Sequence, residues 1–444
     1  MDTCMTFLST SRPLVIACVT VFPLLSTAGE HGFIEDSELL LSTRSVVLNN
    51  QIKGDGHDRR PNNRRDPRDV SLGLKANFTS GFTQGTLGLG IDAFAYSGFK
   101  LDGGDGHAGY GTVQMNKQGE AQRSFGRAGA LVKARYAQTQ LRYGQMQVTN
   151  PVFATSDTRV FPSTATGFLL SSEDLDGVLL EGGHFTAGTE PSSTSSKGGL
   201  WANYANIQTR AVDFAGARYA LNDQWSMSLY GADFQELWHQ YYVGSTYRWT
   251  LDPASRIDLD VNAYQTNDAG QARAGEIDTT AFSTQVAYSW LNHKLSLGFQ
   301  RIIGDTPFDY IGFGNNGSGA FGNSIYLSNP VMASDFNGPN EKSWQLRYDL
   351  DMAPYGLPGL SFMGRYVYGY DISRSPNPNY QAWSAADDAQ HQELDLEARY
   401  VVQSGTAKGM KVRLREGYHN AMRGQPDGDI SMHMLIVEWP LRLF

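Results

Sequence analysis

Short segments in which apolar and polar residues alternate recur along most of the chain. In the first clear segment, residues 225–234, Trp225, Met227 and Leu229 share one face, while Ser226 and Ser228 share the other. A period of two residues is that of a β-strand with one apolar face. Each segment is close to the ~9–11 residues that a tilted strand needs to cross a bilayer. The pattern therefore predicts an all-β fold.

Two architectures satisfy this pattern. A soluble sandwich buries its apolar faces between two sheets, whereas a barrel in lipid turns them outward and encloses its polar faces. Alternation alone does not separate the two. The other clear segments span residues 256–267, 282–290, 343–351, 393–402 and 410–415.

The first 28 residues have the features of an export signal. Arg12 precedes an apolar run over 13–25, and small residues lead to Ala28, where we expect cleavage. An uncleaved anchor is the alternative, but the run is shorter than the ~20 residues of a spanning helix and contains Pro23. We therefore expect a signal peptide over 1–28 and an outer-membrane β-barrel channel over 29–444.

Composition removes several other classes of protein. The only two cysteines, Cys4 and Cys18, lie in the expected signal, so disulfide, zinc and thiolate chemistry drop out after cleavage. A mean hydropathy of -0.37 is too polar for a helical membrane bundle. The net charge of -9 argues against a nucleic-acid partner. The arginine-rich stretch 55–69 lacks interleaved aromatics, so we interpret it as a surface loop.

The lengths of the connections favour the barrel. Transmembrane barrels have tight turns at one end and long loops at the other, and this chain predicts both kinds in rough alternation. With 416 residues after position 28, and roughly 22–24 residues per strand and its loop, we expect 18 antiparallel strands, with sixteen as the alternative. The tight links fall at 137–139, 221–224 and 291–293, and the long ones at 102–126, 149–175 and 304–341.

Many charged residues lie on the polar faces of the predicted strands. If apolar residues face lipid, Lys411, Arg413 and Arg415 line the lumen ~7 Å apart on one strand, a spacing suited to guiding an anion. The alternative is a set of solvated lumen charges that pair with nearby carboxylates, and the pattern leaves both open. The other candidate cations are Arg347, Arg365, Arg399, Lys133 and Arg135, and the nearby carboxylates are Asp349, Asp351, Glu393, Asp395 and Glu397.

Five segments resemble the OprD (Occ) family of substrate-specific outer-membrane porins. The resemblance covers nearly the whole chain after the signal and implies an 18-stranded barrel in the Gram-negative outer membrane. It also implies that the loop around 161–173 folds inward and narrows the channel together with the loop that holds Tyr310. The segments are FPSTATGF (161–168), LEGGHFTAG (180–188), PFDYIGFGNNGSGAFGNSI (307–325), SDFNGPNEKSWQLRYDL (334–350) and YVVQSGTAKG (400–409).

The same resemblance assigns roles to individual residues. Arg399, Arg413 and Arg415 fall on positions of a basic ladder that guides a substrate carboxylate, and Arg159 falls on a loop position that joins the ladder. Tyr310 and Asp335 fall on a pocket for the positive or polar end of the substrate, and we include Asp309 and Ser318 on the same loop as candidate pocket residues.

Two positions depart from the family pattern. Met434 stands where a further ladder arginine is expected, and Ala333 stands where the pocket has a tyrosine. We therefore expect weaker carboxylate guidance, a larger pocket, and a substrate other than the basic amino acid of the best-known members.

Other chemistry finds little support. A Ser/His/Asp site around His184 lacks the G-x-S-x-G elbow, and the glycine-rich stretch at 312–322 lacks the lysine of a phosphate loop. The histidines show no H-x-x-x-H spacing, so we expect no enzyme, no metal and no cofactor. We expect a channel for amino acids, short peptides or related carboxylates, with a general diffusion porin as the alternative. The expected partners are small solutes, outer-membrane lipid and, because Trp439, Leu441 and Phe444 form an aromatic terminal strand, the barrel-assembly machinery; we expect a monomer or weak homo-oligomer.

Overall fold

The computed structural model of the protein describes residues 32–53, 68–102, 111–116, 118, 120–314, 322–421 and 425–442. The expected signal segment, the arginine-rich stretch up to residue 67, and Ser318 lie outside these residues.

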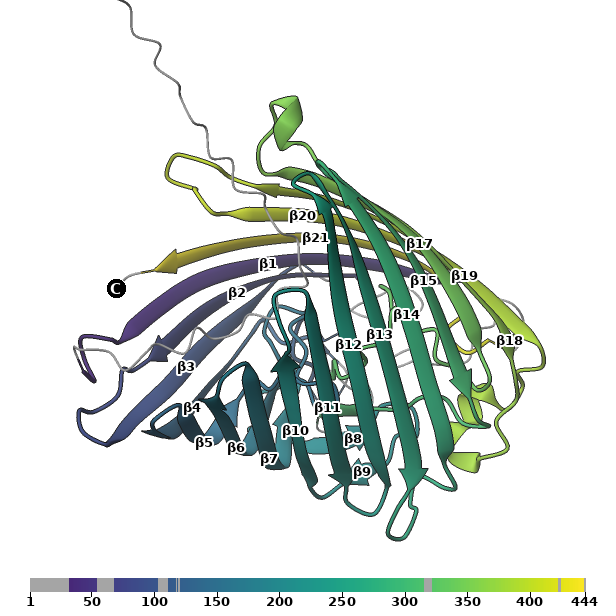
Figure 1. Ribbon diagram of the computed structural model, residues 1–444, viewed down its shortest axis with the longest axis horizontal. Helices are drawn as coiled ribbons and strands as arrows, with labels where there is room; N and C mark the ends of the chain where they lie inside the picture. Colours follow the sequence, from purple (N-terminus) through teal and green to yellow (C-terminus); the bar gives the residue numbers. More distant parts are fainter. Residues whose placement is uncertain are drawn as a thin grey trace, which may run out of the picture.

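Eighteen antiparallel strands form one closed barrel, in which neighbours along the chain are neighbours in the sheet. Figure 1 shows the strands following one another around the wall in chain order. The first nine are β1 (Glu38–Lys53), β2 (Arg68–Thr79), β3 (Leu87–Asp102), β4 (Ser124–Tyr136), β5 (Thr139–Met146), β6 (Thr164–Leu175), β7 (Val178–Thr189), β10 (Val212–Ala220) and β11 (Trp225–Phe234).

In the second half of the barrel, the last strand returns to pair with the first. β21 pairs with β1 along the whole length of β21, from Arg442 opposite Leu40 to Asp429 opposite Lys53, and this pairing closes the barrel. The predicted number of strands is confirmed. The remaining nine are β12 (Trp238–Asp252), β13 (Ser255–Asp268), β14 (Asp278–Trp290), β15 (His293–Ile303), β17 (Lys342–Asp351), β18 (Leu360–Ile372), β19 (Ala389–Val401), β20 (Lys411–Ala421) and β21 (Asp429–Arg442).

The two faces of each strand have the predicted parity. On β15, Leu297 is 59% exposed on the outer surface, whereas Ser296 and Gln300 on the inner surface are buried. Leu229 on β11 and Val132 on β4 are likewise exposed. Apolar side chains therefore face outward and polar ones face the lumen, which is the arrangement of a barrel in lipid.

The predicted tight links are confirmed as turns between β4 and β5, β10 and β11, and β14 and β15. Ala137 and Leu291 begin two-residue turns with φ of 49° and 51°, the left-handed conformation that matches the twist of a hairpin. One predicted loop is wrong in its extent, because residues 164–175 form β6 and the connection covers only 147–163. Polar residues of β6 gave the segment the appearance of a loop, but Ser171 is buried on the inner face.

Long connections fill much of the lumen. Phe153 and Phe161, from residues 147–163, are fully buried against inward side chains such as Phe185 and Phe125. A second, small sheet lies among the connections and pairs β8 (Gly199–Ala202) with β9 (Gln208–Thr209) and β16 (Ile311–Gly314). Among the described residues, the connections also hold the 3-10 helices η2 (Ala353–Tyr355) and η3 (Pro378–Trp383). In the described part of the chain, no helix is long and apolar enough to cross a membrane.

Candidate functional site

Six cations on four adjacent strands form what we call the basic wall: Arg347, Arg365, Arg399, Lys411, Arg413 and Arg415. On β20, the inward Lys411, Arg413 and Arg415 alternate with outward residues such as Leu414, which is 46% exposed. The antiparallel register sets Arg399 of β19 opposite Arg413. It also sets Arg347 of β17 opposite Arg365 of β18. The register, rather than sequence spacing, therefore gathers these residues on one side of the lumen.

Carboxylates neutralise part of the basic wall. Arg365 forms an ion pair of 2.7 Å with Asp395, whose side chain is fully buried. Arg347 pairs at 2.7 Å with Asp349, two residues along its own strand. The positive charges of Arg347 and Arg365 are therefore each balanced by a neighbouring carboxylate.

The remaining cations are less fully paired. Arg413 and Arg415 share Glu397, at 3.5 Å and 3.1 Å. Within the described residues, Arg399 and Lys411 have no carboxylate within ion-pair distance. The side of the wall formed by β19 and β20 therefore carries surplus positive charge, and the side chain of Arg413 is 35% exposed to the lumen.

The inner loop, residues 147–163, is fastened beside the basic wall by Arg44, which sequence analysis missed. Arg44 on β1 donates to the carboxylate of Asp157 at 2.5 Å and to the backbone carbonyl of Arg159 at 2.7 Å. It also donates to Glu438 of β21 at 2.6 Å, and Glu438 lies opposite Lys411 in the register. Arg44 therefore holds the backbone of Arg159 beside β1, which is separated from β20 of the basic wall by a single strand, β21.

The Arg159 side chain contacts its own loop. Its guanidinium donates to the carbonyl and hydroxyl of Thr158, both at 3.2 Å. A buried apolar cluster, with Val160 and Phe161 from the loop and Met434 from β21, packs the loop against the wall. Met434 lies opposite Arg415, so an apolar side chain borders the last arginine of β20.

Two of the predicted cations lie elsewhere. Lys133 on β4 donates to Asp92 at 2.6 Å and to the carbonyl of Ser80 at 2.7 Å. Lys133 and Arg135 both stack on Phe82, at 4.9 Å and 4.4 Å from the ring centre. β4 is separated from β20 by four strands, so the structure does not bring this pair into the basic wall.

The pocket loop, residues 304–341, carries the predicted Tyr310 and Asp335 and brings them into contact. The hydroxyl of Tyr310 donates to Asp335 at 2.8 Å, and a second hydroxyl, from Tyr204, donates to the same oxygen at 2.5 Å. Tyr204 was missed because it lies more than a hundred residues away, between β8 and β9. Ala333 stands where the family pattern has a tyrosine, and its backbone N–H donates to Glu393 of β19 at 2.8 Å.

Asp309 holds the backbone together rather than facing the other pocket side chains. Its buried carboxylate accepts the backbone N–H groups of Tyr204, Ala205 and Tyr310 at 3.0, 2.9 and 2.8 Å. Burial raises the pKa of Asp309 to about 6, although these N–H groups favour the ionised form. Asp309 thus joins the pocket loop to the segment that carries Tyr204.

Comparisons with known proteins agree with this geometry. The model of a family described as outer membrane porin, OprD family, matches residues 31–443. Porin D of Pseudomonas aeruginosa is 46% identical over 416 residues, 93% of this chain and 92% of that protein. The porin-like protein GalP of Pseudomonas putida is 26% identical over 96% of this chain and 99% of its own length.

Solved structures give the same result. A crystal structure of Pseudomonas aeruginosa OprD superposes with a TM-score of 0.81 at 43% identity, covering 94% of this chain and 98% of that one. A structure of Pseudomonas aeruginosa OpdK with vanillate has a TM-score of 0.81 at 26% identity and covers 93% of this chain and all of the other. These relatives are channels rather than enzymes.

Proposed function

Because the chain belongs to the OprD family of porins, whose members lie in the Gram-negative outer membrane, we propose that it gives small carboxylate-bearing solutes a selective path of passive diffusion. Amino acids, short peptides and related compounds are the solutes that we consider. The solute carboxylate moves along the basic wall, past the inner loop.

The surplus positive charge on β19 and β20 is the observation that carries this proposal. Arg399 and Lys411 have no carboxylate partner within the described chain, while Arg413 and Arg415 share one. A guanidinium binds a carboxylate through two parallel hydrogen bonds but is weakly hydrated, so a solute exchanges readily from one arginine to the next. Binding that is favourable but reversible is what a selective channel needs.

The relative solved with vanillate gives further support, because vanillate is a carboxylate and that protein superposes over its whole length. The apolar border at Met434 and the small side chain of Ala333 favour a solute that requires fewer cations and more space at the pocket.

Asp335 is the counterpart for a positive or polar group. Its carboxylate accepts two tyrosine hydroxyls, from Tyr204 and Tyr310, which hold it in one orientation. A zwitterionic solute then meets arginines at one end and a carboxylate at the other.

A general diffusion porin with weak ion preference is the second candidate. The observation in its favour is that Arg347 and Arg365 are already paired with Asp349 and Asp395. Charges neutralised within the wall add little attraction for a passing anion, and solutes then differ mainly in size.

Uptake into liposomes by the purified protein separates the two. We expect a carboxylate to enter faster than its amide of equal size, and Arg399→Gln and Arg413→Gln to slow the carboxylate roughly fivefold, equivalent to about 1 kcal/mol of lost attraction. Arg248→Gln is the matched control, because Arg248 also faces the lumen but lies on β12 and pairs with Asp258. Rates ordered by size alone, with no effect of the wall variants, would refute selectivity.

A further inference from the structure

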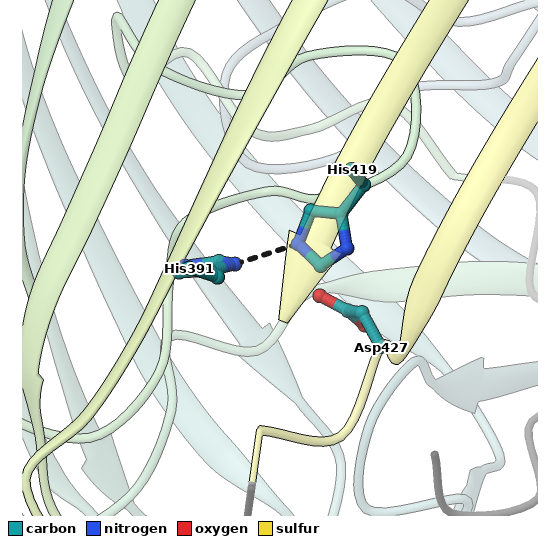
Figure 2. A group of neighbouring side chains, drawn as sticks. All are labelled: His391, His419 and Asp427. Atoms are coloured by element: carbon teal, nitrogen blue, oxygen red, sulfur yellow. Dashed lines mark hydrogen bonds between the residues drawn. The ribbon is translucent and has the colours of Figure 1, made fainter. Parts of the chain in front are cut away.

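Two histidines and an aspartate meet at the inner surface, at the end of the barrel that carries the long loops. His391 extends from β19, His419 from β20, and Asp427 from the segment just after that strand (Figure 2). One ligand atom from each lies within 4.8 Å of the others. Both histidines are buried, at 3% exposure, whereas Asp427 is partly exposed.

The hydrogen bonds of His419 fix its proton. Its Nδ1 lies 2.6 Å from the backbone carbonyl of Gly428. A carbonyl only accepts, so Nδ1 carries the hydrogen and, in the neutral ring, Nε2 carries a lone pair. This lone pair points at Nδ1 of His391, 2.8 Å away.

The neighbouring amide fixes the state of His391. Oε1 of Gln425 accepts the backbone N–H of Asp427 at 2.8 Å, while Nε2 donates to the Asp427 carboxylate at 3.0 Å, so the amide has one orientation. The same Nε2 lies 3.0 Å from Nδ1 of His391, which must therefore accept. Nε2 of His391 donates to Glu341 at 2.7 Å.

Neither of these two nitrogens carries a hydrogen toward the other, so their contact at 2.8 Å is repulsive between neutral rings unless a metal ion or a proton lies between them. A bound metal ion would take the single lone pair of His391 Nδ1, and Gln425 would keep its hydrogen bond to Asp427. We propose that His391, His419 and Asp427 bind a divalent transition-metal ion of the zinc class. Imidazole and carboxylate are suitable ligands, and three protein ligands with one solvent molecule complete a tetrahedral site. Zn–N bonds of ~2.0–2.1 Å place the two nitrogens ~3.3 Å apart, so the rings separate by about 0.5 Å.

The surroundings match those of metal-bound histidines, whose second nitrogen normally donates to a carboxylate or a carbonyl. Glu341 fills that role for His391, and Gly428 fills it for His419. The negative charges of Glu341 and Asp427 balance those of a divalent ion. Sequence spacing did not predict this site because its ligands come from two strands and a connection, 28 residues apart at the histidines.

The site adjoins the candidate pocket. Phe336 follows Asp335 in the chain and stacks on His391 with ring centres 4.0 Å apart. Ser334, on the other side of Asp335, donates to Asp427 at 2.6 Å. A metal ion bound here would therefore also stabilise the pocket loop, because both chain neighbours of Asp335 contact its ligands.

Calorimetric titration of the chelator-treated protein in detergent with ZnCl₂ tests the proposal. We expect one Zn²⁺ per chain, and His419→Gln to weaken binding at least roughly 100-fold. His184→Gln is the matched control, since His184 is paired with Asp213 at 2.7 Å on the outer surface, and it should bind like the wild type.

X-ray absorption of the zinc-loaded wild type keeps the test valid if His419→Gln does not fold. We expect two imidazole nitrogens at ~2.0–2.1 Å from the metal. Failure to bind Zn²⁺ would mean that a proton on His419 resolves the contact instead. Equal weakening by His184→Gln, or a metal without imidazole ligands, would also overturn the proposal.

Discussion

Arg399 and Arg413 lie directly opposite each other on β19 and β20, two like charges in register across one strand pair. Such pairs destabilise a sheet by roughly 0.2–1 kcal/mol. A barrel that served only as a scaffold would gain stability by losing one of them.

Arg399→Gln should therefore separate stability from transport. We expect the free energy of unfolding in lipid vesicles to rise by about 0.5 kcal/mol because the repulsion disappears, while carboxylate uptake falls. Urea titration and liposome uptake measure the two quantities on the same preparation. A loss of stability together with unchanged uptake would contradict the role of Arg399 as a lumen cation.

Arg44→Met should release the inner loop. Arg44 connects Asp157, the carbonyl of Arg159 and Glu438, so its removal leaves Glu438 without that cation. We expect a loss of about 2 kcal/mol in the free energy of unfolding, the usual value for losing charged hydrogen bonds, and a larger single-channel conductance. Arg256→Met is the control. It removes an inward arginine that pairs with Asp258 on β13, far from the inner loop in the chain, and it should leave the single-channel conductance unchanged.

Asp309 predicts a pH dependence of stability. Its pKa is raised from 3.8 to about 6 in the folded protein, so the folded state binds the proton more tightly than the unfolded state. The free energy of unfolding should therefore fall as pH rises from about 4 to about 6. The expected fall is roughly 3 kcal/mol, because each tenfold difference in proton affinity between the two states corresponds to about 1.36 kcal/mol.

Asp309→Asn keeps an acceptor for the backbone N–H groups but carries no charge. The difference in unfolding free energy between variant and wild type should grow through that pH window and then stay constant. A difference that is the same at pH 4 and pH 7 would mean that folding does not raise the pKa of Asp309.

Gly216→Ala tests the packing of the inner surface. A Cβ at this position would overlap the ring of Tyr230, whose hydroxyl donates to Glu181 at 2.5 Å. We expect a loss of roughly 1–3 kcal/mol in stability, the usual cost of overpacking. Gly364→Ala is the control because its nearest contact is an ordinary 3.5 Å, and equal losses for both variants would refute the explanation by Tyr230.

Much of the barrel could be predicted from sequence because one face of every strand meets lipid. The segment from Trp225 was predicted to the residue, and the parity of Lys411, Arg413 and Arg415 was correct. The two-residue period indicates which face of the strand a residue occupies, but it does not indicate how far around the barrel wall that residue lies. Lys133 and Arg135 were for this reason grouped with cations that lie several strands away.

The contents of the lumen were harder to predict. Arg44 is a single cation in an otherwise uncharged stretch of its strand, and its partners come from residue 157 and from the last strand. Tyr204 and the pair His391 and His419 likewise find their partners through the register and the inward loops. Local pattern carries no signal for contacts between segments so far apart in the chain.

The pairing of β1 with β21 has a consequence for assembly. Because β1 pairs with β21, the last strand of the chain, the hydrogen bonds between them form only after β21 has been synthesised. Until then, the two edge strands of the incomplete sheet have unpaired backbone groups. A chain cut before residue 429 has no route to closure and presents two unpaired edges, so we expect it to aggregate or be degraded rather than to form a smaller pore.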